Sequence, residues 1–196
     1  MAHLRPLENH EVDKELQDMF ENYENTRGFC PNSVKTMARR PNISKTFGKL
    51  NQVIMYEGTV QEELKMLVAL ASSLASGCRY CQSHMANLSS IYNAPDEKIA
   101  AIWEFETSEL FTDAERAAIK VGLKAGTLPN DTTEEDFEEL KKHFDDGQIV
   151  EIIATIALFG YLNRWNDTMA TQLEDLPSKV SERALGDKGW DSGKHV

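Results

Sequence analysis

The chain has 196 residues, of which 41% are hydrophobic and 27% charged, and its formal net charge is −11. This length and composition indicate one folded domain with a buried core. The acidic balance argues against nucleic acid and against an anionic membrane surface as partners, because both are bound by clustered Lys and Arg. An acidic, solvated surface that keeps the protein in solution is the simplest interpretation of the charge.

The sequence predicts a cytoplasmic protein. Residues 1–6 have none of the apolar character that a secretory signal needs, and no run approaches the ~20 apolar residues that cross a bilayer. The three cysteines, Cys30, Cys78 and Cys81, do not make the framework of a secreted disulfide-rich domain. In a reducing compartment, the close pair Cys78 and Cys81 indicates redox or metal chemistry rather than a structural disulfide.

Apolar residues recur at helical spacing along most of the chain, and no segment has the pattern of a β-strand. The sequence therefore predicts an all-α fold of about eight to ten helices. In chain order, helices are expected over residues 10–26, 31–39, 43–55, 60–75, 79–92, 93–103, 112–126, 132–143, 148–172 and 177–185. The helix over 60–75 is apolar nearly all round, so it is expected at the centre of the core.

The chain is expected to form a single domain over residues 1–196. Within it we distinguish an N-terminal helical arm (1–50), a core (51–177) and a loose tail (186–196). Three Thr-x-x-Glu pairs match the capping box that begins many helices; they start at Thr59, Thr112 and Thr132.

The stretch that combines the most chemistry is residues 76–84, which read SGCRYCQSH. Gly77 is a plausible C-cap for the preceding helix, so Cys78 would lie at the start of the next one. Cys81 and His84 follow at intervals of three residues, on one face of that helix. A helix N-terminus favours a thiolate, and an imidazole one turn away can share the thiol proton. This pattern predicts a reactive dithiol.

Two other interpretations of the pair remain open. Both cysteines could be small buried residues without chemistry. Alternatively, they could bind zinc, but a zinc site needs four ligands, and the remaining Cys and His residues are scattered. Cys30 is interpreted as structural. The polar residues 163–167, which read NRWND, either line the site, form a subunit contact or mark where a helix leaves the core.

Taken together, four segments resemble the carboxymuconolactone decarboxylase/alkylhydroperoxidase D-like superfamily, and in particular its peroxidase-related branch. They are the motif GCRYCQSH at 77–84, the apolar helix 64–74 before it, the GFCPN segment at 28–32 and the helix 149–167. The resemblance covers most of residues 28–177. It implies an all-α alkylhydroperoxidase D-like fold that associates as dimers, trimers or hexamers.

The resemblance also implies a function. Redox members of the family cycle two motif cysteines between dithiol and disulfide while reducing a hydroperoxide. Here Cys78 and Cys81 would be that pair, with His84 as the motif histidine and an external dithiol as reductant. No metal, haem, flavin or other cofactor is implied. Cys81 is our candidate for the attacking thiolate, with Cys78 resolving the sulfenic acid; the reverse order stays open, because Cys78 is at the helix N-terminus.

Two departures from the family pattern bear on activity. The histidine follows the second cysteine by three residues rather than four. The relay glutamate that redox members carry twelve residues before the first cysteine is Met66 here. Glu57 and Glu151 could reach the site only through tertiary folding. Met66 therefore predicts weak peroxidase turnover, or a non-enzymatic helical assembly or stress-response protein. A lactone decarboxylase-type enzyme of the same superfamily is the other alternative; its chemistry would not need both cysteines, so the presence of the pair favours the redox function.

Overall fold

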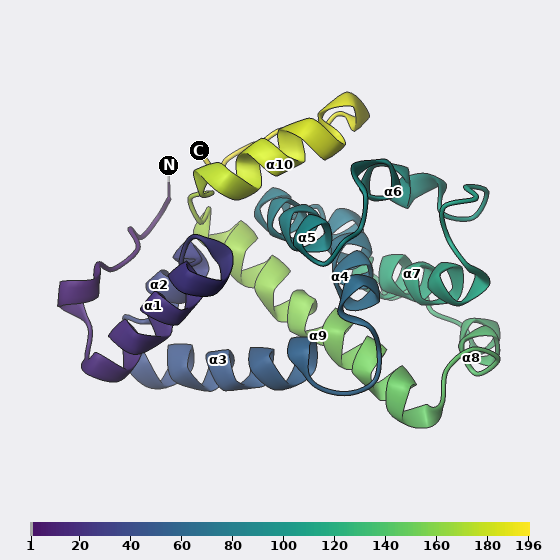
Figure 1. The fold of residues 1–196 in the computed structure, drawn as a ribbon, viewed down its shortest axis with the longest axis horizontal. Coiled ribbons are helices and arrows are strands. Elements are labelled where there is room, and N and C mark those ends of the chain that lie inside the picture. The colour runs from purple at the N-terminus through teal and green to yellow at the C-terminus, as the bar shows by residue number, and fades with distance from the viewer. Residues whose placement is uncertain (1) are drawn as a thin grey trace.

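The computed structural model describes residues 2–196, and within them it contains helices and no β-strand, which confirms the all-α prediction (Figure 1). Over these residues the fold has ten α-helices, joined by turns and three 3-10 helices. Their bounds are α1 (Lys14–Arg27), α2 (Asn32–Met37), α3 (Pro41–Tyr56), α4 (Glu62–Ser76), α5 (Arg79–Ile91), α6 (Asp96–Ala100), α7 (Asp113–Gly126), α8 (Glu134–Leu140), α9 (Asp146–Met169) and α10 (Asp175–Leu185).

Helix α4 is central, as its apolar sequence predicts, and packs against α5, α7 and α9. Its middle is buried on all sides, from Leu64 to Ser73. On one side its residues join a core that also takes Phe20 from α1 and Met37 from α2. On the other side Val68 contributes to a second core with α7 and α9. The expected N-terminal arm therefore shares its core with the central helices.

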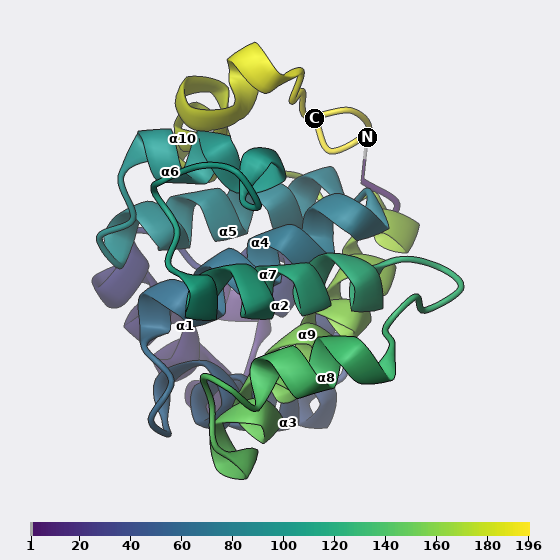
Figure 2. The ribbon, with the colours of Figure 1, turned by 90° about the vertical axis from the view of Figure 1, so that its right-hand side faces the viewer.

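Two glycines of α7 allow that helix to lie directly on α4 (Figure 2). A Cβ added at Gly126 would lie 2.6 Å from the backbone oxygen of Ser72, and one at Gly122 would lie 3.0 Å from that of Val68. Real Cβ atoms do not approach a backbone oxygen as closely as 2.6 Å. Gly126 is therefore required by the close helix–helix contact, and any larger residue would push α7 away.

One of the three expected capping boxes is present as predicted: Thr112 and Glu115 form the box at the start of α7. The box predicted from Thr132 and Glu135 is wrong by one residue, because the side chains of Thr133 and Asp136 cap α8 instead. Both satisfy backbone N–H groups that a helix start leaves without intrahelical partners.

The capping box predicted at Thr59 is wrong, because α4 begins three residues later and its N-cap is Gln61. The backbone N–H of Thr59 instead donates to the carboxylate of Glu151 on α9, at 2.9 Å. Glu151 is held there by Lys65, whose ammonium group lies 2.9 Å away and whose side chain is only 1% exposed. A buried cation needs a charged partner, so this ion pair fixes the turn before α4.

The C-terminal segment is packed against the molecule, so the expectation of a loose tail over 186–196 is wrong. Trp190 is 8% exposed and His195 only 1%. The backbone oxygen of His195 accepts a hydrogen bond of 2.8 Å from the N–H of Leu173. The tail is ordered because burial of the Trp190 and His195 rings contributes more free energy than the ordering of this short segment costs in conformational entropy.

Helix α10 lies across α5 and α6 on one side of the molecule (Figures 1 and 2). It can do so because α9 ends at Met169, where Ala170 adopts a left-handed backbone with φ of 47° and stops the helix. The predicted end of this helix at residue 172 is therefore three residues too late. In the part of the chain that the structure describes, no helix combines the length and apolar character needed to cross a membrane.

Candidate active site

The two cysteines of the motif meet at the junction of α4 and α5. Gly77 ends α4 with a left-handed φ of 75°, and Cys78 is the N-cap residue of α5. The Sγ of Cys78 accepts a hydrogen bond from the backbone N–H of Cys81 at 3.4 Å. Both cysteines are free thiols and buried. The local sequence thus places Cys78 at the N-cap of α5 and Cys81 in its first turn.

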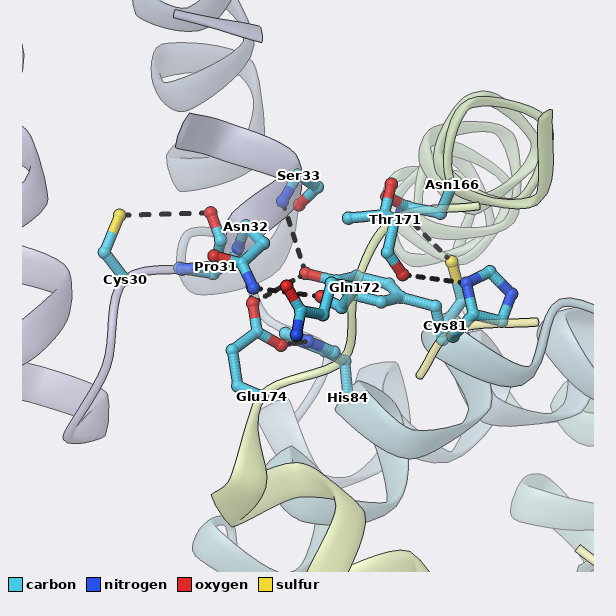
Figure 3. A network of polar contacts seen from close by, with 12 residues as sticks. Cys30, Pro31, Asn32, Ser33, Cys81, His84, Asn166, Thr171, Gln172 and Glu174 are labelled. Carbon is cyan, nitrogen blue, oxygen red and sulfur yellow. Dashed lines mark hydrogen bonds and ion pairs between the residues drawn. The ribbon is translucent and has the colours of Figure 1, made fainter. Parts of the chain in front are cut away.

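The Sγ of Cys81 has a second polar neighbour, because Asn166 of α9 donates its Nδ2–H to it at 3.4 Å (Figure 3). Burial raises the pKa of the Cys81 thiol well above its usual value, and Cys78 raises it further. The Asn166 hydrogen bond acts in the opposite direction. Cys81 therefore rests as a thiol and needs a base to become a nucleophile. The polar residues 163–167 contribute Asn166 to this site.

His84 is paired with a carboxylate that the sequence analysis did not identify. The Nε2 of His84 lies 2.7 Å from Oε2 of Glu174, the N-cap residue of α10 (Figure 3). Their side chains are 8% and 11% exposed. Because an ionised carboxylate only accepts hydrogen bonds, the Nε2–H of His84 donates, which leaves Nδ1 as the basic nitrogen.

Glu174 is held by residues of two other helices, α5 and α2. Its Oε1 accepts a hydrogen bond of 2.9 Å from the hydroxyl of Tyr80, and another from the backbone N–H of Asn32. Burial raises the pKa of Glu174. The neighbouring His84 and the hydrogen bonds lower it by more than burial raises it, so the pKa of Glu174 lies below its usual value. Glu174 is consequently ionised at neutral pH and orients His84.

Aromatic rings enclose the His84 side chain. The ring of Tyr80 stacks on it with centroids 4.3 Å apart, and Phe29 meets it edge-on at 5.5 Å. The backbone N–H of Ser33 donates to the Tyr80 hydroxyl oxygen at 3.3 Å. The GFCPN segment therefore acts by carrying Phe29 and Asn32 to the site. Cys30 in that segment is buried, and burial raises the pKa of its thiol to about 12.

The C-terminal segment supports the chain just before Glu174. The imidazole of His195 makes a 2.8 Å hydrogen bond through Nδ1 to the backbone oxygen of Thr171. The backbone of His195 binds Leu173 in addition. The tail thus holds residues 171–173 in place, and with them the position of the following carboxylate.

A small inner cavity of about 40 Å³ lies beside these groups. Cys81, His84, Tyr80 and Asn166 line it together with apolar side chains, and Cys78 does not. This volume has room for a few water-sized molecules. Of the two cysteines of the motif, Cys81 lines the cavity together with His84, and the carboxylate of Glu174 binds that histidine.

The sequence motif predicted Cys78, Cys81 and His84 as site residues, and the structure places all three at one end of α5. Met66 is fully buried in the core and does not line the inner cavity. Glu151 binds Lys65 at the far end of α4 and does not reach His84. The residue that sequence reasoning missed is Glu174, because no spacing or motif connects it with the cysteines.

Known proteins resemble the chain in both sequence and structure. A family model described as carboxymuconolactone decarboxylase family matches residues 41–123. The crystal structure of the debrominase Bmp8 in its apo form is 34% identical, with a TM-score of 0.85 over 92% of this chain and 96% of that chain. A cysteine-to-alanine variant of that enzyme in complex with 2,3,4-tribromopyrrole is 33% identical, with the same TM-score and coverage.

A more distant likeness concerns the fold alone. An uncharacterized peroxidase-related protein from Ralstonia eutropha JMP134, with an alkylhydroperoxidase AhpD core, is 23% identical. Its TM-score is 0.79 over 90% of this chain and 94% of that chain. No curated protein sequence matches the chain. The chain belongs to the carboxymuconolactone decarboxylase family and has the AhpD-like fold.

Proposed function

We propose that the protein is a thiol-dependent oxidoreductase that reduces hydroperoxides with electrons from Cys78 and Cys81. The observation that carries the proposal is the arrangement around the inner cavity. Cys81 and His84 line the same small space, and Glu174 binds the imidazole from the other side. A thiol, a base and a carboxylate that orients the base are the groups that nucleophilic thiol chemistry requires.

In the first step, His84 takes the proton of Cys81 on Nδ1. The Sγ thiolate of Cys81 then attacks the terminal oxygen of the hydroperoxide, and the O–O bond breaks. The alkoxide leaves with the proton held by His84. Cys81 becomes a sulfenic acid and the hydroperoxide becomes an alcohol, so the thiol has lost two electrons and the peroxide has gained them.

In the second step, Cys78 attacks the sulfenic sulfur of Cys81. A disulfide forms between them and water leaves with the thiol proton of Cys78. Cys78 is suited to this role because its Sγ lies at the N-terminus of α5 and accepts the N–H of Cys81. An external dithiol then reduces the disulfide by thiol–disulfide exchange, which returns both cysteines to thiols.

Glu174 supplies the carboxylate that the family pattern would place at residue 66. It reaches His84 from the start of α10 rather than from α4. A carboxylate on one nitrogen of an imidazole fixes the tautomer and raises the basicity of the other nitrogen. The presence of Met66 is therefore compatible with turnover in this chain.

The proposal is tested by peroxide consumption and by trapping the sulfenic acid. The reduced protein is mixed with hydrogen peroxide and an external dithiol, beside the Cys78→Ser and Cys81→Ser variants. With a sulfenic-acid reagent, we expect labelling of Cys78→Ser at Cys81 and none of Cys81→Ser. Equal labelling of both would overturn the assignment of roles. A wild type that neither consumes peroxide nor forms the disulfide would overturn the redox function and favour a non-enzymatic role.

The likeness to the debrominase favours a second candidate, reductive dehalogenation of a brominated heteroaromatic ring. In that reaction a Cys81 thiolate takes the bromine, the ring carbon takes a proton, and Cys78 then displaces bromide to form the disulfide. The balance is one C–Br bond reduced to C–H for one disulfide and one HBr formed. The inner cavity of about 40 Å³ would have to widen for a brominated ring, so the hydroperoxide is our leading substrate. Bromide release from brominated pyrroles, measured by ion chromatography, distinguishes the two.

A further inference from the structure

A larger groove opens on the surface next to the inner cavity. It has a volume of about 640 Å³ and lies between α1, α3 and α5. Its walls are mainly apolar or aromatic, and they include Met19, Tyr23, Val53, Tyr56 and Ile91. Both the volume and the lining fall within the range of sites that bind organic molecules.

The groove and the inner cavity adjoin one another. Their linings share Tyr23, Arg27, Asn51, Tyr56 and Leu88. These five residues form the junction between the solvent-accessible groove and the space that Cys81 and His84 line. A molecule in the groove therefore lies against the side chains that border the inner cavity, and its reactive end would pass between them to reach Cys81.

Arg27 is the charged residue of this junction. Its guanidinium carbon lies 4.9 Å from the ring centroid of Tyr23 and 5.7 Å from that of Tyr56, and it donates a hydrogen bond to the Tyr56 hydroxyl. Within residues 2–196, no carboxylate forms an ion pair with Arg27 or with Lys49 on the groove wall.

The positive charge of Arg27 and Lys49 at the groove is opposite in sign to the net charge of the chain. The chain has a net charge of −11, and within residues 2–196 most of the Lys and Arg side chains form an ion pair with a carboxylate. An arginine that is half-buried against two tyrosines, with no anionic partner, has its fork of donors available to a carboxylate ligand. Burial raises the pKa of Tyr56 to about 12, so its hydroxyl stays neutral beside such a ligand.

We propose that the groove binds the organic part of the substrate and that Arg27 binds an acidic group on it. The substrate class is then an apolar hydroperoxide that carries a carboxylate. This inference rests on the proposed function, which it extends from the reacting group to the rest of the substrate. Arg27 is in this view a specificity-determining residue, which binds substrate without taking part in the transfer of electrons.

The experiment compares cumene hydroperoxide with its para-carboxylate, which share the reacting group and differ in charge. In the wild type we expect kcat/KM to be about tenfold to a hundredfold higher for the carboxylate, the effect of one charge-assisted hydrogen bond. In Arg27→Met this ratio should fall to about 1. Arg40→Met removes an exposed arginine outside the groove and should keep the wild-type ratio.

A second pair of variants tests the groove itself. Val53→Glu places a negative charge on its wall, whereas Leu50→Glu places one on the same helix outside it. Both residues are about half exposed, at 54% and 50%, so neither change should disturb folding. We expect Val53→Glu to raise KM for the carboxylated hydroperoxide more than for the neutral one, and Leu50→Glu to leave both unchanged.

Direct binding separates this inference from the proposed function. Calorimetry with 4-isopropylbenzoate, which has no peroxide, should show binding to the wild type that Arg27→Met loses. If the protein reduces peroxides but shows no preference for the carboxylate, the inference is wrong and the function stands. If no peroxide is reduced, the proposed function is wrong. The binding of 4-isopropylbenzoate then tests by itself whether the groove and Arg27 bind a carboxylate. If Val53→Glu changes the molar mass of the protein and not ligand binding, the groove belongs to a second copy and the inference is overturned.

Discussion

Glu174 lies 2.7 Å from His84 although 90 residues separate them in the chain. The helix α5 that carries His84 and the start of α10 that carries Glu174 are brought together by the packing of α10 on α5. The site of this protein is therefore assembled from a local motif and a distant carboxylate. Each half has its own testable consequence.

Glu174→Gln should lower peroxidase activity about a hundredfold, the contribution of an oriented general base. The amide keeps the size of the carboxylate and can still accept a hydrogen bond from Tyr80, so folding should be retained. Stopped-flow measurement of peroxide reduction gives the rate. Asp175→Asn removes the neighbouring exposed carboxylate and serves as the control, which should keep wild-type activity. A Glu174→Gln enzyme with the wild-type rate would show that the pair is structural.

The reactivity of Cys81 should rise with pH into the alkaline range. Its pKa is raised by burial and by Cys78, and the thiolate is the reacting form, so the reactive fraction grows until the pH passes that raised pKa. An exposed cysteine would reach its plateau near its ordinary pKa of about 8.5. The measurement is the rate of alkylation of Cys81 by iodoacetamide between pH 6 and about 10, a range that spans that ordinary pKa.

The same profile in Cys78→Ser provides the comparison. Removal of the Cys78 sulfur takes away one of the groups that raise the pKa of Cys81, so the profile should move toward lower pH. A plateau below pH 8 in the wild type would contradict the raised pKa.

Met66→Glu should destabilise the protein and should not increase its activity. Met66 is fully buried in the core, where a carboxylate without a partner costs at least about 3 kcal/mol. His84 is already bound by Glu174, so a second carboxylate has no role to fill. Denaturant unfolding and kcat/KM are measured beside Met66→Leu, which should change stability by less than about 1.5 kcal/mol. A stable Met66→Glu variant with higher kcat/KM would mean that the family relay can be restored.

Two glycine substitutions should change stability in opposite directions. Gly126→Ala places a methyl group 2.6 Å from the backbone oxygen of Ser72 and should destabilise by about 1–3 kcal/mol. Gly160 lies within α9 with nothing within 4 Å of an added Cβ, so Gly160→Ala should stabilise by about 0.5–1 kcal/mol through helix propensity. Thermal unfolding measures both. A Gly126→Ala variant that is as stable as the wild type would contradict the close contact of α7 with α4, and a destabilised Gly160→Ala variant would contradict the open space around Gly160.

Association into dimers, trimers or hexamers stays a prediction from the family resemblance. Light scattering at micromolar concentration measures the molar mass, and a value of one 22.1 kDa chain would contradict the prediction. An added reductant controls for disulfide-linked species, because all three cysteines are free.

Much of the fold follows from local patterns that the sequence displays. The capping box at Thr112, the left-handed Gly77 and the helical spacing of the motif involve residues within a few positions of one another. Their conformations depend on short-range sterics and hydrogen bonds, which the sequence specifies directly. For the same reason, the positions of Cys78 and Cys81 at the start of α5 could be predicted.

Predictions that depended on distant partners were less successful. Thr59 has the correct spacing for a capping box, yet its N–H binds Glu151, which lies 92 residues away on α9. The tail was expected to be loose, yet His195 is buried against the segment that precedes Glu174. In each case a long-range contact outweighed the local preference. More free energy depends on the pairing of a buried charge or the burial of a ring than on a single helix cap.

Local patterns in the sequence suffice to predict most of the helices, the central place of α4 and the spacing of Cys78, Cys81 and His84. Tertiary contacts determine which carboxylate binds His84, that Asn166 binds the Cys81 sulfur, and that Arg27 lies between the groove and the inner cavity. Helical periodicity sets which side chains share a face, whereas the faces that meet depend on how the helices within residues 2–196 fill the core together.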